Sequence, residues 1–253
     1  MAVVFKNTPL NEVIFGIQFK EPILSADDIY ELISLLKDEY TQISEHPPLP
    51  SIIESPTKAR TQFFSKDFVS RKHLVHKEKN KLIQIQPDRL LFNWRKASEE
   101  SIYPKFDKMY TELKHVLSII SDKIRGDVAS HINQYEYTYI DHVYLESFGI
   151  DEYEIDKILN IFSCRKTVKD LHIEYSLPKE ELGGVLNVLI RTAKNKKDNR
   201  KLFVIENTCR GYSNHGGMDD WFESAHQVLL DNFLDITTEQ AKKVWAYQEE
   251  SYV

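Results

Sequence analysis

Two strand-like stretches with the same pattern decide the fold: Asn11-Glu12-Val13-Ile14-Phe15-Gly16-Ile17-Gln18-Phe19 and Gln134-Tyr135-Glu136-Tyr137-Thr138-Tyr139-Ile140-Asp141-His142-Val143. In each stretch, large apolar or aromatic residues fall on alternate positions, which is typical of a β-strand with one buried face. Each stretch is followed by the same order of elements, namely a helix, several short strands and a long helix. We therefore expect a duplicated β-α-β-β-β-α unit, with residues 1–126 as the first copy and residues 131–253 as the second.

The first copy shows clear helix and turn signals after its opening strand. Ser25 is a good N-cap residue, and Asp27 and Asp28 suit the positive first turn of a helix. The proline-rich connection 46–56 is expected to be irregular, because proline cannot donate a backbone hydrogen bond. The expected elements are a helix over 26–40, strands over 61–68, 72–77, 81–86 and 89–94, and a helix over 103–125.

The second copy is expected to repeat this order and to add one C-terminal helix capped by Thr237 or Thr238. Because the strands run consecutively without alternating helices, the fold class is α+β with a mostly antiparallel sheet. The two units could form two sheets or one continuous curved sheet with helices on one face. The expected elements are strands over 133–145, 168–177, 185–192 and 201–207, and helices over 151–162 and 219–233.

Composition restricts the classes of function. The 253 residues are 42% hydrophobic and 28% charged, as in ordinary globular proteins. No apolar run approaches the roughly 20 residues that span a bilayer, and the N-terminus is charged too early for a signal peptide. We expect a cytoplasmic protein without membrane contact. Residues 131–253 carry 14 Lys and Arg against 21 Asp and Glu, which argues against general nucleic-acid binding.

The residues that most often hold metals are too few and too scattered for a site. Cys164 and Cys209 lie far apart, and we expect both to be buried reduced thiols. Glu223 and His226 can share one helix face, but a metal site would need a second such pair or further ligands. We therefore expect neither a metal nor a cofactor.

The second opening strand carries the most polar decoration in the chain. Glu136, Thr138 and His142 fall on one of its faces, where a carboxylate and an imidazole could bind a polar ligand or act in acid–base chemistry. The alternative is that these residues tie the strand to its neighbours through hydrogen bonds. Both interpretations stay open at this point.

A glycine-containing loop precedes the expected helix at 219 and is a second candidate for ligand binding. Backbone N–H groups at a helix N-terminus favour an anion, but Asp219 and Asp220 would repel phosphate and can cap the helix themselves. A surface loop is the alternative. The ligand-binding candidates in this loop are Asn214, His215, Gly216 and Gly217.

Aromatic residues and a basic hairpin are candidates for partner binding. Trp94 and Arg95 end the last strand of the first unit, and tryptophan and arginine often anchor interfaces. Tyr137 and Tyr139 are further candidates. The basic hairpin 71–81 could contact an acidic partner or nucleic acid, or it could be a solvated edge. We expect a homo-oligomer or a hetero-oligomer.

Four blocks of sequence carry a resemblance to a known family, and together they extend over nearly the whole chain. They are Asn7-Thr8-Pro9-Leu10-Asn11-Glu12; Phe92-Asn93-Trp94-Arg95 with Tyr103-Pro104; the stretch from Asn133 to His142; and Ala225-His226 with Phe233, Thr237-Thr238 and Trp245. The chain resembles a family of sporadically distributed, roughly 250-residue prokaryotic proteins of uncharacterised function. It departs from the family at Asp141, where Asn is usual. The resemblance implies no catalytic residues and a patchy occurrence that is typical of defence-associated genes.

Three functional hypotheses follow. The first is a non-catalytic subunit of a multi-protein bacterial anti-phage defence system, which binds and regulates an effector enzyme encoded nearby, such as an NAD-consuming enzyme or a nuclease. The second is a sensor that binds a nucleotide-like small molecule in the cleft between the two units. The third is an unrecognised hydrolase that uses His142 or His226 with a nearby carboxylate.

Overall fold

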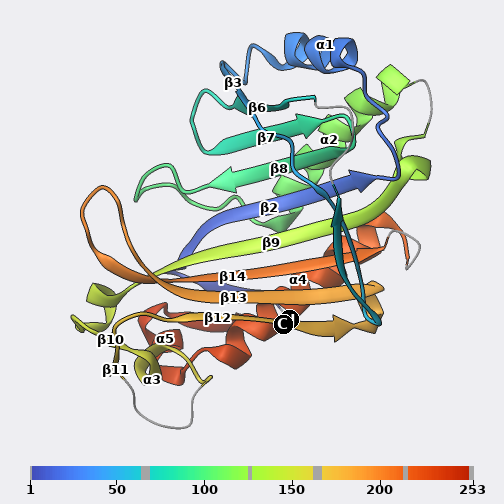
Figure 1. Cartoon of the computed structure of the whole chain (residues 1–253). Coiled ribbons are helices and arrows are strands. Elements are labelled where there is room, and N and C mark those ends of the chain that lie inside the picture. The colour runs from blue at the N-terminus through green and yellow to red at the C-terminus, as the bar shows by residue number, and fades with distance from the viewer. Residues whose placement is uncertain (1, 64–68, 125–126, 162–166, 213–215, 251–253) are drawn as a thin grey trace.

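The computed structural model describes residues 2–63, 69–124, 127–161, 167–212 and 216–250. The fold is α+β, and its centre is one nine-stranded antiparallel sheet in the order β12-β13-β14-β9-β2-β8-β7-β6-β3 (Figure 1). The strands that precede residue 126 are β2 (Leu10–Phe19), β3 (Gln42–His46), β6 (Arg71–Val75), β7 (Lys81–Gln86) and β8 (Arg89–Arg95). Those that follow are β9 (Ile132–Tyr144), β12 (His172–Lys179), β13 (Gly184–Lys194) and β14 (Lys201–Tyr212).

The two opening strands lie side by side at the centre of this sheet. β2 and β9 pair antiparallel, and Phe15 lies opposite Tyr137. From this central pair the order runs outwards through β8, β7, β6 and β3 on one side and through β14, β13 and β12 on the other. Of the two arrangements that the sequence left open, one continuous sheet is therefore the observed one.

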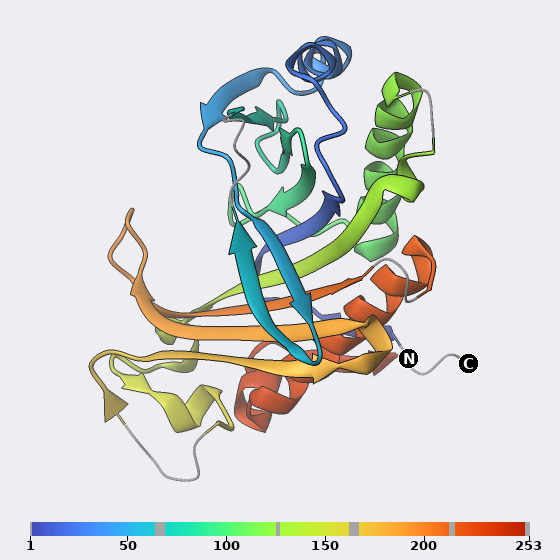
Figure 2. The ribbon, with the colours of Figure 1, turned by 45° about the vertical axis from the view of Figure 1, so that its right-hand side comes forward.

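Two long helices, α2 (Phe106–Ile124) and α4 (Met218–Ile236), cover one face of the sheet (Figure 2). The aromatic residues of the central strands pack against them. The ring centroid of Phe15 lies 4.5 Å from that of Tyr137, 5.9 Å from that of Phe106 and 5.4 Å from that of Phe222. Burial of such large rings is the main source of stability for a core of this kind.

The first helix, α1 (Ala26–Leu36), begins where the capping residues predict. The Ser25 side chain accepts a hydrogen bond from the backbone N–H of Asp28, and the Asp28 carboxylate accepts one from the backbone N–H of Ser25. This reciprocal capping satisfies two backbone donors that the first turn leaves unpaired. The expected apolar stripe is buried and consists of Ile29, Leu32, Ile33, Leu36 and Tyr40.

The proline-rich connection differs from the prediction. Instead of an irregular segment followed by a sheet strand over 61–68, residues 51–63 form a hairpin of β4 (Ser51–Ser55) and β5 (Lys58–Phe63), which crosses the face of the sheet that α2 and α4 leave open (Figure 2). As far as the structure describes the chain, the hairpin has no ladder with the large sheet. The alternation of apolar and polar residues cannot tell a strand of the large sheet from a strand of a separate hairpin, because side chains alternate between the two faces in both cases.

The segment after β9 also differs from the prediction. The expected helix over 151–162 is reduced to α3 (Ile155–Ile158), and the residues just before it form β10 (Tyr153–Glu154), which pairs with β11 (Thr167–Val168). The chain leaves the helix at Leu159, which bridges Thr237. Tertiary pairing therefore ends a helix that the apolar spacing would have allowed to continue.

The two ends of the described chain lie together. β1 (Ala2–Phe5) pairs antiparallel with β15 (Tyr247–Glu250), which follows α5 (Glu239–Val244). Thr238 caps α5 by accepting a hydrogen bond from the backbone N–H of Ala241. Three short 3₁₀ helices complete the described elements, at Val128–His131, Leu145–Phe148 and Glu180–Leu182. Among the described residues, no helix is both long enough and apolar enough to cross a bilayer.

Candidate functional site

The face of the sheet opposite α2 and α4 is unusually polar, and we call it the open face. Side chains alternate along a strand, so the pleat that buries Phe15 and Tyr137 under the helices turns Gln18 and Glu136 the other way. The β4–β5 hairpin covers one part of the open face, and a basic cleft lies at another part. These two places bring together charged and hydrogen-bonding side chains from distant parts of the sequence.

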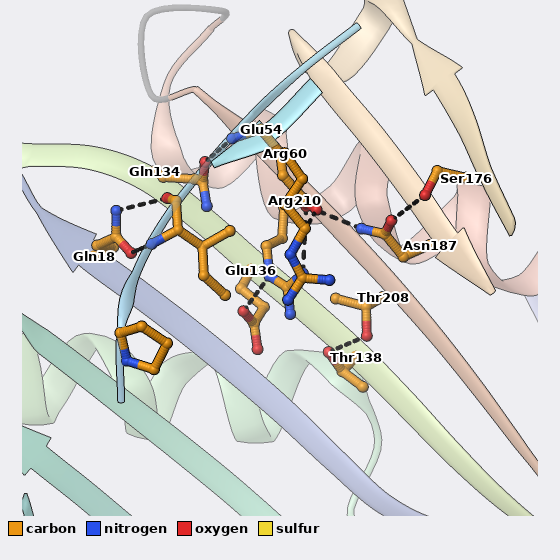
Figure 3. Close-up of polar contacts among 12 residues, drawn as sticks. Gln18, Glu54, Arg60, Gln134, Glu136, Thr138, Ser176, Asn187, Thr208 and Arg210 are labelled. Carbon is orange, nitrogen blue, oxygen red and sulfur yellow. Dashed lines mark hydrogen bonds and ion pairs between the residues drawn. The ribbon is translucent and has the colours of Figure 1, made fainter. Parts of the chain in front are cut away.

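Glu54 of the hairpin is the centre of a buried polar network on the open face (Figure 3). Its carboxylate is only 3% exposed and receives a hydrogen bond of 2.9 Å from Asn187 of β13. It forms ion pairs with Arg210 of β14 at 3.3 Å and with Arg60 of β5 at 3.4 Å. The Arg210 guanidinium also binds Glu136 of β9 at 2.5 Å. One arginine thus bridges two carboxylates that come from different elements.

The charges of this network depend on one another. Burial by itself raises the pKa of Glu136, but Arg210 and Arg89 hold the pKa of that carboxyl below its ordinary value. Burial likewise disfavours a charged Arg210, but Glu136 and Glu54 raise the pKa of its guanidinium. Glu136 and Arg210 therefore both stay ionised, and the loss of either leaves a buried charge without its partner.

The basic cleft is a second site, and it lies where the two halves of the chain meet. Its volume is about 730 Å³. Residues 96–99, after β8, line it from the first half, and His142 of β9 and Arg191 of β13 line it from the second. The charged lining consists of the cations Lys96, Arg191, Lys194, Lys196, Lys197 and Arg200, and the acids Glu99, Glu146 and Asp198.

Only some of these cations are neutralised by the protein. Arg200 binds Glu146 at 2.6 Å and Asp198 at 2.7 Å, and its guanidinium lies 4.2 Å from the centre of the Tyr144 ring. Lys96 and Arg200 share the third acid, Glu99. Within the part of the chain that the structure describes, no carboxylate lies within ion-pair distance of the remaining four cations: Arg191, Lys194, Lys196 and Lys197.

His142 is the predicted ligand-binding residue that lies in the basic cleft. Its side chain is half-buried, and burial together with the nearby Arg191 lowers the pKa of its imidazole. The ring is therefore neutral near pH 7 and can both donate and accept hydrogen bonds. Glu136 is six residues away on the same strand, which is about 20 Å in an extended chain. The structure does not bring these two residues together.

The other predicted ligand-binding residues lie elsewhere. Glu136 belongs to the network under the hairpin, and the Thr138 hydroxyl bonds that of Thr208 at 2.9 Å, so both residues connect neighbouring strands. Gly217 is the N-cap residue of α4, and Gly216 precedes it with a positive φ of 93°. Asn214 and His215 lie outside the described residues.

The aromatic residues that were predicted to bind a partner belong to the core. Trp94 is 1% exposed, and Tyr137 and Tyr139 are also buried. The Tyr137 hydroxyl lies 2.9 Å from that of Tyr139, which in turn lies 2.6 Å from Nδ1 of His226. As placed, none of these three aromatic residues offers a surface to a partner. Arg95 lies on the open face and is partly exposed.

The histidine and cysteine that were considered as metal ligands lie between the helices and the sheet, His226 partly buried and Cys209 fully buried. Burial lowers the pKa of His226 to about 4, and its ring stacks on Phe106 with a centroid distance of 4.7 Å. Cys209 is buried, and burial raises the pKa of its thiol. Cys164 lies outside the described residues. Among those that are described, no group of three or more His, Cys, Asp or Glu residues is arranged to hold a metal ion.

Asp141 lies in the core as a protonated acid. It is only 4% exposed, and burial raises the pKa of its carboxyl to about 8. At pH 7 the side chain is therefore mostly neutral.

Of the residues that hold the hairpin, sequence reasoning found Glu136 but missed Gln18 and Gln134. Gln134 and Glu136 are spaced by two on their strand, and this polar alternation could have indicated a second covered face. No comparable signal marks Glu54, which follows a proline-rich segment without periodicity. Its partners Asn187 and Arg210 come from strands more than 130 positions later.

Comparisons with known proteins add no family at this point. No protein-family model matches the chain, and no curated protein matches it. The resemblance drawn from the four sequence blocks therefore remains a prediction.

Replacing Arg210 tests the charge network. Arg210→Leu is expected to lower the free energy of unfolding by about 3–5 kcal/mol at pH 7, because Glu136 and Glu54 lose the guanidinium between them. The depressed pKa of Glu136 stabilises the wild type above its unfolded-state pKa, and this contribution is lost as the pH falls. In the variant, Glu136 can take up a proton as the pH falls, and this removes the buried charge that has lost its partner. The difference in free energy of unfolding between wild type and variant, measured by guanidinium unfolding, should therefore be smaller at about pH 4.5 than at pH 7.

The matched control for this experiment is Lys242→Leu, which removes an ion pair with the exposed Glu239. It should change stability little at either pH. A difference between wild type and Arg210→Leu that does not vary with pH would contradict the proposed charge coupling.

Replacing Asp141 tests its protonation. Because the folded-state pKa lies above the unfolded-state value, the contribution of Asp141 to stability is complete below about pH 4 and is lost as the pH rises to about 8. Asp141→Asn avoids this loss, so it should stabilise the protein by up to about 4 kcal/mol at pH 7 and by less at pH 4.5. Guanidinium unfolding at both pH values measures the change, with Asp235→Asn, at an exposed position of α4, as the control. Equal stabilisation at both pH values would argue against a protonated Asp141.

Proposed function

We propose that this protein is a non-catalytic binding protein that holds an anionic ligand of nucleotide size in the basic cleft. The observation that carries the proposal is a cavity of about 730 Å³ in which cations outnumber acids and four cations have no carboxylate within ion-pair distance among the described residues. Cavities of roughly 300–1,000 Å³ are typical of sites for small molecules and cofactors.

The lining suits a phosphate-bearing molecule. Arg191 presents a guanidinium that can bind two phosphate oxygens at once, and Lys194 adds a second positive charge on the same strand. The neutral imidazole of His142 and the amide of Asn11 provide hydrogen bonds for an uncharged part of the ligand. Excess positive charge in the cleft also attracts an anion before contact.

The same geometry favours binding over catalysis. Among the described residues, the His142 side chain has no hydrogen bond to a carboxylate that could orient it as a general base. Hydrolase chemistry with Glu136 would need the two residues within hydrogen-bond reach, whereas they are about 20 Å apart along β9. His226 bonds a tyrosine hydroxyl in the core. The hydrolase hypothesis therefore has less support than a sensor.

The proposal also includes an interpretation of the fold as an internal repeat. We interpret the two halves as pseudo-repeated β-α-β-β-β-α units that meet at β2 and β9, over residues 1–126 and 131–253. The strand orders on the two sides of the central pair support this interpretation. The basic cleft then lies at the seam of the two units, where a ligand contacts both.

Ligand screening tests the function directly. ATP and inorganic pyrophosphate are expected to raise the melting temperature of the full chain, because a ligand that binds only the folded state stabilises it. In calorimetry, Arg191→Ser should lower the affinity for the ligand that binds best by about tenfold or more. Added salt should lower this affinity further. Lys242→Ser, outside the cleft, is the control. If neither anion shifts the melting temperature, the proposal is wrong.

A second candidate is the regulatory subunit that binds an effector enzyme in an anti-phage defence system. Exposed apolar residues favour a protein partner: Tyr30 of α1 is 56% exposed and Ile43 of the edge strand β3 is 49% exposed. Both lie near the Lys72–Glu45 ion pair, whose lysine also bonds the Tyr30 hydroxyl. The defence setting and the neighbouring effector rest on the resemblance.

Co-expression with the products of neighbouring genes tests this candidate. The chain should co-purify with one of them, and the double variant Tyr30→Ser/Ile43→Ser should reduce recovery of the complex severalfold, because it removes the exposed apolar surface. Leu177→Ser is the control, since Leu177 is 40% exposed on β12 at the opposite edge of the sheet. Purification of the chain alone in every combination would count against a subunit.

A further inference from the structure

The segment from Leu49 to Glu54 lies extended on the open face, and side chains of the sheet hold its main chain. The Gln86 amide accepts a hydrogen bond from the Leu49 N–H at 2.9 Å and donates one to the Leu49 carbonyl at 3.0 Å. The Gln18 amide makes the same pair of bonds with Ile52, both at 2.9 Å. Each glutamine thus acts towards one residue of the segment as a neighbouring β-strand would.

Two more side chains continue this row across the sheet. Arg89 donates a hydrogen bond of 2.9 Å to the Pro50 carbonyl, and the Gln134 carbonyl oxygen accepts one of 3.3 Å from the Glu54 N–H. We call Gln18, Gln86, Arg89 and Gln134 the track; all four are buried and come from β2, β7, β8 and β9. These contacts involve only backbone atoms of the segment, so they tolerate many sequences.

Two side chains of the segment add selectivity. Ile52 is buried against the open face, and two residues later the Glu54 carboxylate binds Arg210 and Asn187. An extended peptide with an apolar residue followed two positions later by an acid therefore matches the face. A neutral residue in place of the acid would leave the Arg210 guanidinium with one carboxylate fewer.

The segment can leave without breaking the sheet. Among the described residues, β4 pairs only with β5, and these two strands form a separate two-stranded sheet. The outer strand β5 is largely exposed, and Phe63 at its end is 48% exposed. The hydrogen bonds that hold the segment come from amide and guanidinium side chains. The contact is therefore largely polar, unlike the aromatic core on the other face.

We propose that the track is a docking surface for an extended peptide segment of a partner protein, carrying an apolar residue and then an acid two positions later. In the free chain, the segment from Leu49 to Glu54 occupies the track as an internal ligand. The proposal uses none of the residues that line the basic cleft, so either can fail alone. It deepens the second candidate function, because it names a surface and the chemistry of the partner that binds it.

The test uses the full chain and a fluorescent peptide with the sequence of residues 47–56. Ile52→Gly/Glu54→Ala alters only the internal segment and should expose the track. In fluorescence anisotropy the peptide should bind this variant about tenfold or more tighter than it binds the wild type, in which the tethered segment competes at high effective concentration. Adding Gln18→Leu to the variant should weaken peptide binding by about tenfold, and so should replacing the acid of the peptide with alanine.

Hydrogen exchange shows whether the variant remains folded. The amides of β2 and β9 should stay protected while those of residues 51–55 lose protection. Adding Arg191→Ser, in the cleft, should leave peptide binding unchanged, which separates this result from the ligand assay. The proposal is overturned if the segment stays protected in the variant, or if the exposed track binds no peptide. The proposal is also overturned if Gln18→Leu leaves peptide binding unchanged, or if the variant forms a concentration-dependent dimer and binds no peptide.

Discussion

The pairing of β2 with β9 imposes a constraint that reaches every other part of the molecule. Both strands alternate large apolar side chains with polar ones, so pairing in register places Phe15 and Tyr137 on one face and Gln18 and Glu136 on the other. A slip of one strand by one residue would turn its ring towards the open face. The helices α2 and α4 cover the rings because no other surface can bury them, and the opposite face must satisfy its polar groups in another way.

The hairpin supplies hydrogen-bond and ion-pair partners for the polar groups of the open face, so charges and amides take the place of apolar packing there. A buried ion pair gains Coulomb energy and loses hydration, so it often stabilises a protein no more than apolar residues of the same size would. The arrangement of Glu54, Arg210 and Glu136 therefore specifies where the hairpin lies more than it increases stability. For the segment to leave the track as we propose, water has to replace each of these partners.

Much of the fold could be predicted because it depends on local signals. The strand alternation, the capping box at Ser25 and the apolar stripe of α1 each depend on residues a few positions apart, so they are readable in the sequence. The placement of the hairpin could not be predicted, because its partners Asn187 and Arg210 are distant in sequence and their spacing carries no period. For the same reason His142 was found as a polar strand residue, whereas the cations around it become a cleft only when two halves of the chain meet.

Asp141 and His142 show how one strand divides its polar groups. Alternation along the strand already places these neighbouring side chains on opposite faces in the sequence. In the fold Asp141 enters the core, where burial raises the pKa of its carboxyl to about 8, and His142 enters the cleft, where burial and Arg191 lower the pKa of its imidazole. The carboxylate that shares a strand face with His142 is that of Glu136, which belongs to the network under the hairpin. The strand with the most polar side chains therefore divides them among the core, the hairpin and the cleft, and the acid and the imidazole of its open face lie about 20 Å apart.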